Sequence, residues 1–344
     1  MIGWYVHSHG SGHAQRLAAV TPHLRTPVTV LSSLPPRTEV PGDWVQLPDD
    51  LPTGNDTDVT AGGTLHWAPR HHRGLLKRAA EITRWVERAR PALVVVDVSV
   101  EIAVLVRSLG VPVVVAAMRG ERTDRAHVTA YDLADALLAP WPADLPEPWP
   151  SAWLDKTWHV GALSRLDGRP KCPAPGGRRV AVLWGQGGSE VGLADVRAAE
   201  RATPAWTWDV IGLPGAPWVP DPWPVLQAAD VVVTSAGQNA LAEVAAAGRP
   251  AVVLPQERPY GEQRANTAAL TRAGLAVVRE AWPAAEQWSD LLTETAALDG
   301  GRWKQWSDGR GAARAAAMLD RAALDWKAPE VDRCDREVLA CAPR

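Results

Sequence analysis

Small and polar residues between positions 235 and 263 have the types and spacing that would hold a sugar nucleotide. Gly237 follows a short β-branched run at 230–234 and precedes an alanine-rich stretch at 239–247, which predicts a strand, a turn and a helix. Such a turn exposes backbone N–H groups at the positive end of a helix dipole, and Gly237 lets the backbone approach closely. This stretch therefore predicts a phosphate site.

Further polar side chains follow in an order that matches the other parts of such a ligand. Asn239 can donate a hydrogen bond at the same turn, and Glu243 lies one helical turn further along the same face, where it could accept from both ribose hydroxyls. After a predicted strand at 251–254, Glu262 and Gln263 offer partners for sugar hydroxyls. We interpret the ordered set as a nucleotide-sugar site. The alternative is a plain strand–helix–strand unit with solvated polar residues on its helix.

Two segments of this stretch resemble the donor-site signature of GT-B glycosyltransferases. They are S-A-G-Q-N-A-L-A-E-V-A-A-A-G-R-P and P-Q-E-R-P-Y-G-E-Q-R-A-N. They are similar to two branches: the UDP-glycosyltransferases of small molecules, and the peptidoglycan lipid-intermediate N-acetylglucosaminyltransferase, which is family 28-like. The resemblance implies that Ser235, Gly237 and Asn239 contact the diphosphate. It also implies that Glu243 contacts the ribose, and that Glu262 and Gln263 contact the donor sugar. Ser235 stands where the small-molecule branch has His, and Ala240 where it has Ser.

Composition bounds the class of protein. The 344 residues suffice for two ordinary domains, and a net charge of −3 provides no basic field for nucleic acid. Three scattered cysteines suit a reducing compartment, without a disulfide framework. We see no signal peptide, and Glu101 and Arg107 interrupt the longest apolar run. We therefore expect a cytoplasmic protein, with peripheral contact to the inner face of the membrane if the acceptor is a lipid.

A glycine-rich turn also lies near the N-terminus, between a predicted strand at 2–7 and a predicted helix at 14–24. This arrangement opens a doubly wound domain, although the third glycine of the dinucleotide fingerprint is displaced. The sequence G-S-G-H-A-Q-R resembles the acceptor-side loop of GT-B enzymes, whose histidine is the catalytic base in the small-molecule branch. The resemblance implies that His13 is a base. It also implies an acceptor loop made of Gly10, Ser11 and Gly12.

Asp97 is the candidate partner of this base. It ends the apolar run at 91–97, so it lies at the carboxyl end of a central strand, where ligands bind in open α/β sheets. It could simply cap the helix predicted at 99–109. However, L-V-V-V-D resembles the strand end of the small-molecule branch, where an Asp pairs with the base. A buried carboxylate would orient the imidazole and stabilise the imidazolium, so we predict a His13–Asp97 dyad.

Two groups of residues could bind a metal, and we favour neither. Asp56 and Asp58 form a D-x-D pattern, which binds metal in GT-A transferases, but they lie in a polar stretch at 35–70 that we predict to be a long loop. Three histidines precede a helix predicted at 75–90 without supporting ligand spacing, and we expect them to be solvated or to line the acceptor site. They are His66, His71 and His72. We predict no metal site and no obligatory cofactor.

Aromatic usage is unusual, with 18 Trp, 3 Tyr and no Phe. We interpret the Trp residues as core residues that occupy positions where Phe usually lies. The alternative is an aromatic acceptor pocket, built from the cluster that precedes the interdomain link. That cluster consists of Trp141, Trp149, Trp153 and Trp158.

The second half repeats the strand, glycine-rich loop and helix. The phrase V-G-A-L at 160–163 resembles the interdomain link of GT-B enzymes, and a strand predicted at 179–184 is followed by G-Q-G-G-S. This loop should cradle phosphate from the other side, or it is a plain tight turn. Its candidate residues are Gly187, Gly188 and Ser189. The resemblance also implies that the backbone of Val219, next to Trp218, contacts the base edge.

The predicted fold is α/β, of the GT-B type, with two doubly wound Rossmann-like domains that face each other across a cleft. We expect an acceptor domain at 1–162, a nucleotide-sugar donor domain at 163–322, and a tail at 323–344 that crosses back to the first domain. The expected activity is transfer of a hexose from a nucleoside diphosphate, UDP by resemblance, to an acceptor hydroxyl with inversion. Helix N-termini would stabilise the leaving diphosphate. The alternatives are a nucleotide-sugar hydrolase or epimerase of the same fold, and a non-catalytic nucleotide-sugar-binding protein.

Overall fold

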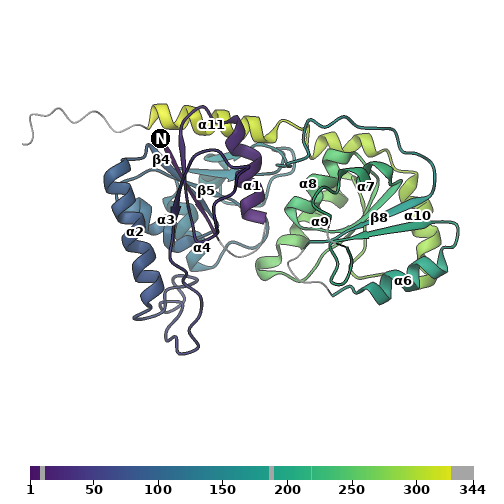
Figure 1. The fold of residues 1–344 in the computed structure, drawn as a ribbon, viewed down its shortest axis with the longest axis horizontal. Coiled ribbons are helices and arrows are strands. Elements are labelled where there is room, and N and C mark those ends of the chain that lie inside the picture. Colours follow the sequence, from purple (N-terminus) through teal and green to yellow (C-terminus); the bar gives the residue numbers. More distant parts are fainter. Residues whose placement is uncertain (8–11, 186–189, 218, 327–344) are drawn as a thin grey trace, which may run out of the picture.

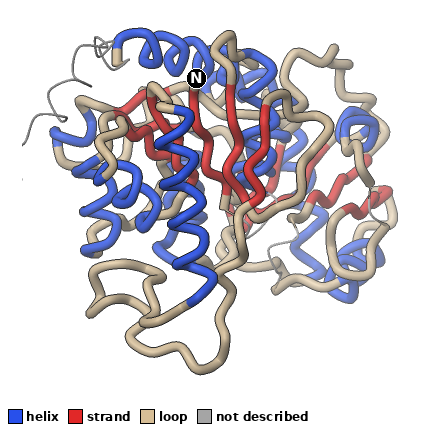
Figure 2. Tube along the Cα trace, turned by 60° about the vertical axis from the view of Figure 1, so that its left-hand side comes forward, coloured by secondary structure: helices blue, strands red, loops and turns tan. Residues whose placement is uncertain are grey.

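Two separate parallel sheets, each covered by helices on both faces, make up the protein (Figures 1 and 2). The computed structural model describes residues 1–7, 12–185, 190–217 and 219–326. None of the helices in these residues is long and apolar enough to cross a membrane. The two sheets confirm the predicted α/β architecture with two Rossmann-like halves.

The first sheet has seven parallel strands in the order β3-β2-β1-β4-β5-β6-β7. The strands are β1 (Ile2–Val6), β2 (Val28–Ser32), β3 (Asp43–Gln46), β4 (Leu93–Asp97), β5 (Val113–Ala116), β6 (Ala136–Ala139) and β7 (Thr157–His159). The helices of this half are α1 (Gly12–Val20), α2 (Arg73–Ala89), α3 (Val100–Ser108), α4 (Arg125–Leu133) and α5 (Ser151–Leu154). The strand order reverses between β1 and β4, so their carboxyl ends form a switch point of the kind at which α/β sheets bind ligands.

The second sheet has five parallel strands in the order β12-β11-β10-β8-β9. The strands are β8 (Arg179–Leu183), β9 (Thr207–Ile211), β10 (Val231–Ser235), β11 (Ala251–Leu254) and β12 (Val277–Val278). The helices that follow or precede them are α6 (Leu193–Ala202), α7 (Trp223–Ala228), α8 (Gln238–Ala247), α9 (Glu262–Ala273) and α10 (Trp288–Ala296). Here the order reverses between β8 and β10, which places a second switch point at the turn after β10.

The central strands are apolar because helices cover both of their faces. Every residue of β1, β4 and β10 is buried, and most of them are β-branched. Trp4, Trp141, Trp288 and Trp303 are among the largest fully buried side chains, so the interpretation of Trp as core residues is confirmed for them.

Several short strands were not predicted, β3 and β7 among them. β3 lies in the segment at 35–70 that we predicted to be a loop, and β7 lies directly before the V-G-A-L phrase. They are the two edge strands of the first sheet, each contacts one neighbour, and their residues are only half buried or exposed. Without two covered faces, neither strand needs the apolar run by which the central strands are recognised.

The last described helix, α11 (Gly311–Asp325), returns to the first sheet and lies along it (Figure 1). Its alanines and Leu319 pack against α1 and the apolar face of β1 and β4. Arg314 donates two hydrogen bonds to the carbonyl of Val160, at the link between the halves. The return thus begins at residue 311, and the expected division at 322 falls inside this helix.

Candidate active site

His13 and Asp97 meet at the switch point of the first sheet. Asp97 is the last residue of β4, and His13 lies in the first turn of α1, which follows β1. Nδ1 of His13 lies 2.9 Å from Oδ1 of the fully buried Asp97. With Nδ1 engaged in this way, Nε2 of the imidazole is left to serve as a base, which is the arrangement that the dyad prediction requires.

Arg16 completes this group, and the sequence interpretation gave it no role. Its Nη1 donates to the same Asp97 oxygen at 2.6 Å. Burial opposes ionisation of Asp97, but the charges of Arg16 and His13 outweigh burial and hold its pKa below the ordinary value. The spacing contained a signal, because residues 13 and 16 share one face of a helix.

The start of α8 faces the start of α1 across the two halves. Nη2 of Arg16 donates to Oε1 of Gln238 at 2.7 Å, and Nδ2 of Asn239 donates to Oε1 of Gln15 at 2.9 Å. Gly237 is the residue before α8, so the N-terminal end of this helix, with its positive dipole end, lies against the first turns of α1. The predicted diphosphate site and the predicted base therefore lie next to each other, where the two halves are in contact.

Two amide side chains from α9 fix the turn that precedes α8. Oε1 of Gln263 accepts from the N–H groups of Ala236 and Gln256, and Nδ2 of Asn266 donates to the carbonyl of Ala236. Gln263 was predicted to contact the donor sugar, but its oxygen already accepts these two hydrogen bonds. Only its Nε2, which lies near Gly237, remains to contact a ligand. Ser235 ends β10 beneath this turn and is buried. The structure thus gives Gln263 a structural task beside any contact to a ligand.

Glu243 lies one turn into α8, and its carboxylate faces the link between the halves. It is 7% exposed and accepts from Nε of Arg165 at 3.1 Å. Burial raises the pKa of Glu243, against the opposing charge of Arg165. Nη1 of Arg165 donates to the carbonyl of Pro220, next to the half-buried Val219. Arg165 had no predicted role. It connects Glu243, which was predicted to bind the ribose, with the segment next to Val219, which was predicted to contact the nucleobase.

A cavity of about 260 Å³ lies between the halves, beside Glu262. Its apolar walls come from the ends of β4 and β5 and from α4, and include Val98, Val115, Met118 and Tyr131. Burial raises the pKa of Glu262, while the charges of Arg122, Arg16 and His13 oppose the rise. None of the four tryptophans proposed as an acceptor pocket lines this cavity. Trp149 and Trp153 instead pack behind Tyr131.

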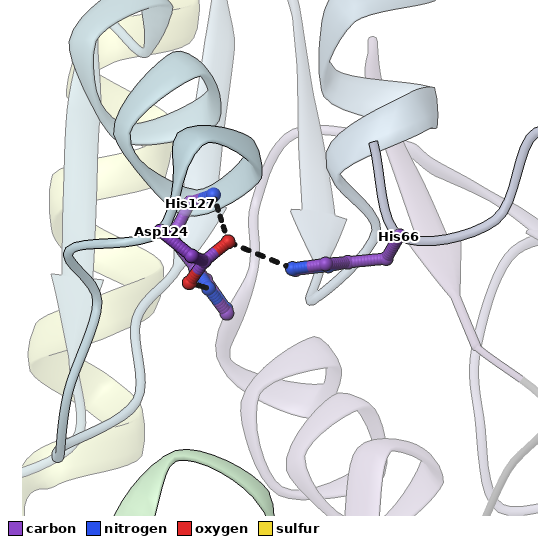
Figure 3. A group of neighbouring side chains, drawn as sticks. All are labelled: His66, Asp124 and His127. Carbon is purple, nitrogen blue, oxygen red and sulfur yellow. Dashed lines mark hydrogen bonds and ion pairs between the residues drawn. The ribbon is translucent and has the colours of Figure 1, made fainter. Parts of the chain in front are cut away.

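His66, Asp124 and His127 form a compact polar group at the wall of this cavity (Figure 3). Nε2 of His66 and Nδ1 of His127 lie 3.1 and 2.5 Å from the two oxygens of Asp124, and Nη1 of Arg122 lies 3.3 Å from Nε2 of His127. Burial, reinforced by the Arg122 charge, lowers the pKa of His127 to about 4 despite Asp124.

These contacts fix the tautomer of the neutral His127, with the proton on Nδ1 facing Asp124 and the lone pair on Nε2 facing Arg122. A cation bound to Nδ1 would place the proton on Nε2. The N–H of His127 would then face the N–H of Arg122, so two donors would meet without an acceptor. Hydrogen bonds therefore account for the group without a metal ion. His66 lines the cavity, whereas His72 caps α2. Asp56 and Asp58 make local contacts to Thr53 and Arg70.

Several predicted residues lie outside the described residues: Gly10, Ser11, Gly187, Gly188, Ser189 and Trp218. Gly12 is described, and it begins α1 close to the side chain of Asn239.

A larger cavity, of about 660 Å³, lies at the opposite end of the second sheet. Asp230 and Pro250, which line it, precede β10 and β11. Parallel α/β sheets bind ligands at the carboxyl ends of their strands, so the smaller cavity and the contact between α1 and α8 form the better candidate site.

Comparison with known proteins supports the same region. Residues 216–288 match the model of the glycosyltransferase family 28 C-terminal domain. A relative from Sorangium cellulosum (strain So ce56), UDP-N-acetylglucosamine--N-acetylmuramyl-(pentapeptide) pyrophosphoryl-undecaprenol N-acetylglucosamine transferase, is 36% identical over 124 residues. This match covers 34% of the chain and 28% of the relative, so the chain spans little more than a quarter of the relative's length. The family match contains the predicted donor stretch at 235–263 and confirms the resemblance there.

Solved glycosyltransferase structures share the whole fold. The glycotransferase of kitacinnamycin has a TM-score of 0.66 at 20% identity, covering 95% of this chain and 98% of that chain. UGT2 of Phytolacca americana, complexed with UDP-2fluoro-glucose and pterostilbene, has a TM-score of 0.64 at 17% identity, covering 95% and 99%. MurG of Acinetobacter baumannii has a TM-score of 0.62 at 16% identity, covering 93% and 99%. At these identities the likeness concerns the fold, and the predicted GT-B fold is confirmed.

Proposed function

We propose that this protein is an inverting glycosyltransferase that moves a hexose from a UDP-linked donor to an acceptor hydroxyl. One observation carries the proposal: the His13–Asp97 pair lies beside the N-terminus of α8, and two hydrogen bonds join α1 to α8. A base and an anion site so arranged suit attack by a hydroxyl on a carbon whose leaving group is a phosphate. The family 28 match at 216–288 supports the donor half of this assignment.

In the proposed step, Nε2 of His13 takes the proton of the acceptor hydroxyl. The hydroxyl oxygen forms a bond to the anomeric carbon while the bond from that carbon to the diphosphate oxygen breaks, and UDP leaves. Asp97 stabilises the imidazolium, with Arg16 holding the carboxylate in place. A single displacement of this kind inverts the anomeric carbon.

The donor is proposed to lie along α8. The N–H groups after Gly237 and the side chain of Asn239 would receive the diphosphate, Glu243 the ribose and Glu262 the sugar. The positive end of α8 supplies the charge stabilisation, so we propose that no metal is obligatory. An enzyme of this kind would act in the cytoplasm, and a lipid acceptor would bring it to the inner face of the membrane.

The test begins with a thermal-shift panel of nucleotides and nucleotide sugars, since a ligand that binds only the native state raises the melting temperature. The best UDP-sugar is then incubated with and without acceptors, and the anomeric configuration of the product is read by proton NMR. Inverted product formed only with an acceptor is expected. Release of free sugar at the same rate without an acceptor indicates a hydrolase, and tight UDP binding without turnover indicates a binding protein.

A further inference from the structure

The second half contributes one wall of the cavity next to the proposed base. Pro259, Tyr260 and Glu262 line it from the segment between β11 and α9, whereas the remaining apolar wall belongs to the first half. Val98 directly follows Asp97, so the cavity begins where the proposed base is anchored. A molecule in this cavity therefore contacts the proposed sugar contact, Glu262, and the residue that follows Asp97.

The backbone of Tyr260 is docked on the first half at very close range. Its carbonyl accepts from the N–H of Glu121 at 2.8 Å. Gly120 has φ +98, and a Cβ atom at that position would lie 2.3 Å from the same carbonyl oxygen. Glu147 holds this part of the first half in place, because it accepts from the backbone of Gly120 and from Arg119. The cavity is thus assembled only while this contact between the halves is made.

Tyr260 itself has φ +63, a conformation that a bulky side chain seldom adopts. Glycine would suit that backbone better, so an observed tyrosine points to a task for the ring. The ring lies 4.5 Å from that of His127 and 5.5 Å from that of His66, and the guanidinium of Arg122 lies 5.1 Å from its centroid. The ring is therefore held as one wall of the cavity.

Size and charge limit what this cavity can hold. Its volume of about 260 Å³ falls below the range of roughly 300–1,000 Å³ that is typical of pockets for drug-sized ligands. Its walls are mainly apolar and aromatic, and their charged residues carry both signs: Arg122, Arg258 and Glu262. Contacts run from Arg122 through His127 and Asp124 to His66, so this polar group is internally satisfied. A small, flat, uncharged molecule fits these properties, and a sugar linked to a long lipid does not.

We propose that this cavity binds the acceptor, that the acceptor is a small planar molecule with a hydroxyl group, such as a phenol, and that Tyr260 closes the cavity and determines specificity for it. This inference rests on the proposed function, because it assigns the acceptor to the same site. Since Tyr260 belongs to the half that binds the donor, binding of the acceptor depends on how the two halves meet.

The test uses 4-methylumbelliferone as the small acceptor, with UDP-glucose and UDP-N-acetylglucosamine as donors. Tyr260→Gly removes the ring but suits the positive φ, and it should raise KM for 4-methylumbelliferone about tenfold or more while leaving the Kd of UDP within about twofold. Tyr260→Phe keeps the ring and should restore KM to nearly the wild-type value.

A second variant tests the contact rather than the ring. Gly120→Ala should push Tyr260 away and raise the same KM by about tenfold, again with unchanged UDP binding. Gly110→Ala is its matched control, because Gly110 also has a positive φ, +78, but a Cβ atom there would meet nothing within 4 Å. It should leave KM unchanged within about twofold.

The inference is overturned if Tyr260→Gly and Gly120→Ala keep the wild-type KM, or if undecaprenyl-pyrophosphoryl N-acetylmuramyl pentapeptide is glycosylated while 4-methylumbelliferone is not. If the proposed function itself is wrong, neither acceptor receives a sugar, which is a different result. Even then, fluorescence titration of 4-methylumbelliferone decides the inference. Binding that both variants weaken supports the cavity assignment, and absence of binding to the wild-type protein overturns it.

Discussion

The guanidinium of Arg16 lies 2.6 Å from the carboxylate of Asp97, and both side chains are buried. The pair joins the first turn of α1 to the end of β4, and the same carboxylate oxygen also accepts from His13. Arg16 extends further to Gln238 at the start of α8. One buried ion pair thus connects the proposed base, the sheet that positions it and the start of α8 in the other half.

His13→Ala should lower kcat by about 10²–10⁴-fold, because the variant loses proton transfer to a positioned base. His13 contacts Asp97 and lies outside the proposed donor contacts, so the Kd of UDP should change little. Steady-state kinetics and calorimetry with UDP separate the two effects. Full activity in the variant would remove His13 from the mechanism. His23, an exposed histidine just after α1, provides the control substitution.

Asp97→Asn should lower the free energy of unfolding at pH 7 by about 3–5 kcal/mol, because it leaves Arg16 as an unpaired buried charge. The native pKa of Asp97 lies below its unfolded value, so its contribution is complete above the unfolded pKa and is lost as the pH falls through the native pKa. Urea unfolding as a function of pH should show the difference between the two proteins shrinking in acid.

The control for this measurement is Asp325→Asn, because Asp325 is exposed at the end of α11. Its effect should stay within about 0.5 kcal/mol at each pH. An Asp97→Asn variant as stable as the wild type would contradict the view that the ion pair is needed to hold α1.

Glu243→Gln should weaken UDP binding about tenfold, since one charged acceptor for ribose hydroxyls is lost. With 2′-deoxy-UDP the loss should be smaller, because one of the two hydroxyls is already absent. Calorimetry with both nucleotides on both proteins gives the complete cycle. An equal loss with both nucleotides would place Glu243 in a purely structural role beside Arg165. Glu294→Gln, at an exposed carboxylate on α10, is the control.

Asp167→Asn should stabilise the protein at pH 7, by on the order of 1 kcal/mol after allowance for partial exposure. Burial raises the pKa of Asp167 to about 6, so the native state holds the proton more tightly than the unfolded state. The wild type therefore loses stability as the pH rises from about 4 to 6, and the Asn variant does not.

The opposite sign is expected for Asp308→Asn. The hydrogen bond from Arg314 lowers the pKa of Asp308, so its ionised form favours the native state above pH 4. Thermal unfolding of both variants at pH 4 and pH 7 checks the pair of predictions. Shifts of the same sign at pH 7 would contradict the assignment of the two carboxyl groups.

Chelation should leave the rate of sugar transfer unchanged, because helix N–H groups and not a cation are proposed to stabilise the diphosphate. The rate is measured before and after dialysis against EDTA, and again after addition of Mg²⁺, Mn²⁺ or Zn²⁺. Activity lost on dialysis and restored by one of these ions would identify a required metal. The polar group of His66, Asp124 and His127 would then be the first place to look.

The sequence was most informative where the physics is local. Buried parallel strands show as apolar runs, and a turn before a helix shows as small residues, so the two Rossmann-like halves could be predicted. The GT-B fold and the base His13 were expected from the resemblance of short motifs, and the position of Asp97 at a strand end supported its pairing with His13. Glu243 was placed on the correct helix, but its burial against Arg165 depends on how the link at 160–165 folds back. That contact joins residues 78 positions apart and has no local signature.

Contacts between the halves could not be predicted for the same reason. Tyr260 was part of a quoted motif, yet its role as a wall of the cavity follows from Gly120, which lies in the other half of the chain. Gln263 shows the converse case, because a resemblance suggested a ligand contact where two backbone N–H groups already occupy its oxygen. The side-chain partners of a residue depend on the whole folded chain, whereas a motif covers only a short segment of it.

Helix α11 gives the protein an architecture in which the N-terminal lobe is not a continuous piece of polypeptide. Residues 311–325 cover the outer face of the N-terminal lobe. Gly311 lies so close to the carbonyl of Ala162 that α11 begins directly beside the link between the lobes. Chimeras that exchange lobes between proteins of this fold must therefore take this helix from the same parent as the N-terminal lobe. A chimera joined only at the link would lack the matching α11. The apolar surface that the alanines of this helix cover would then be exposed and would promote aggregation.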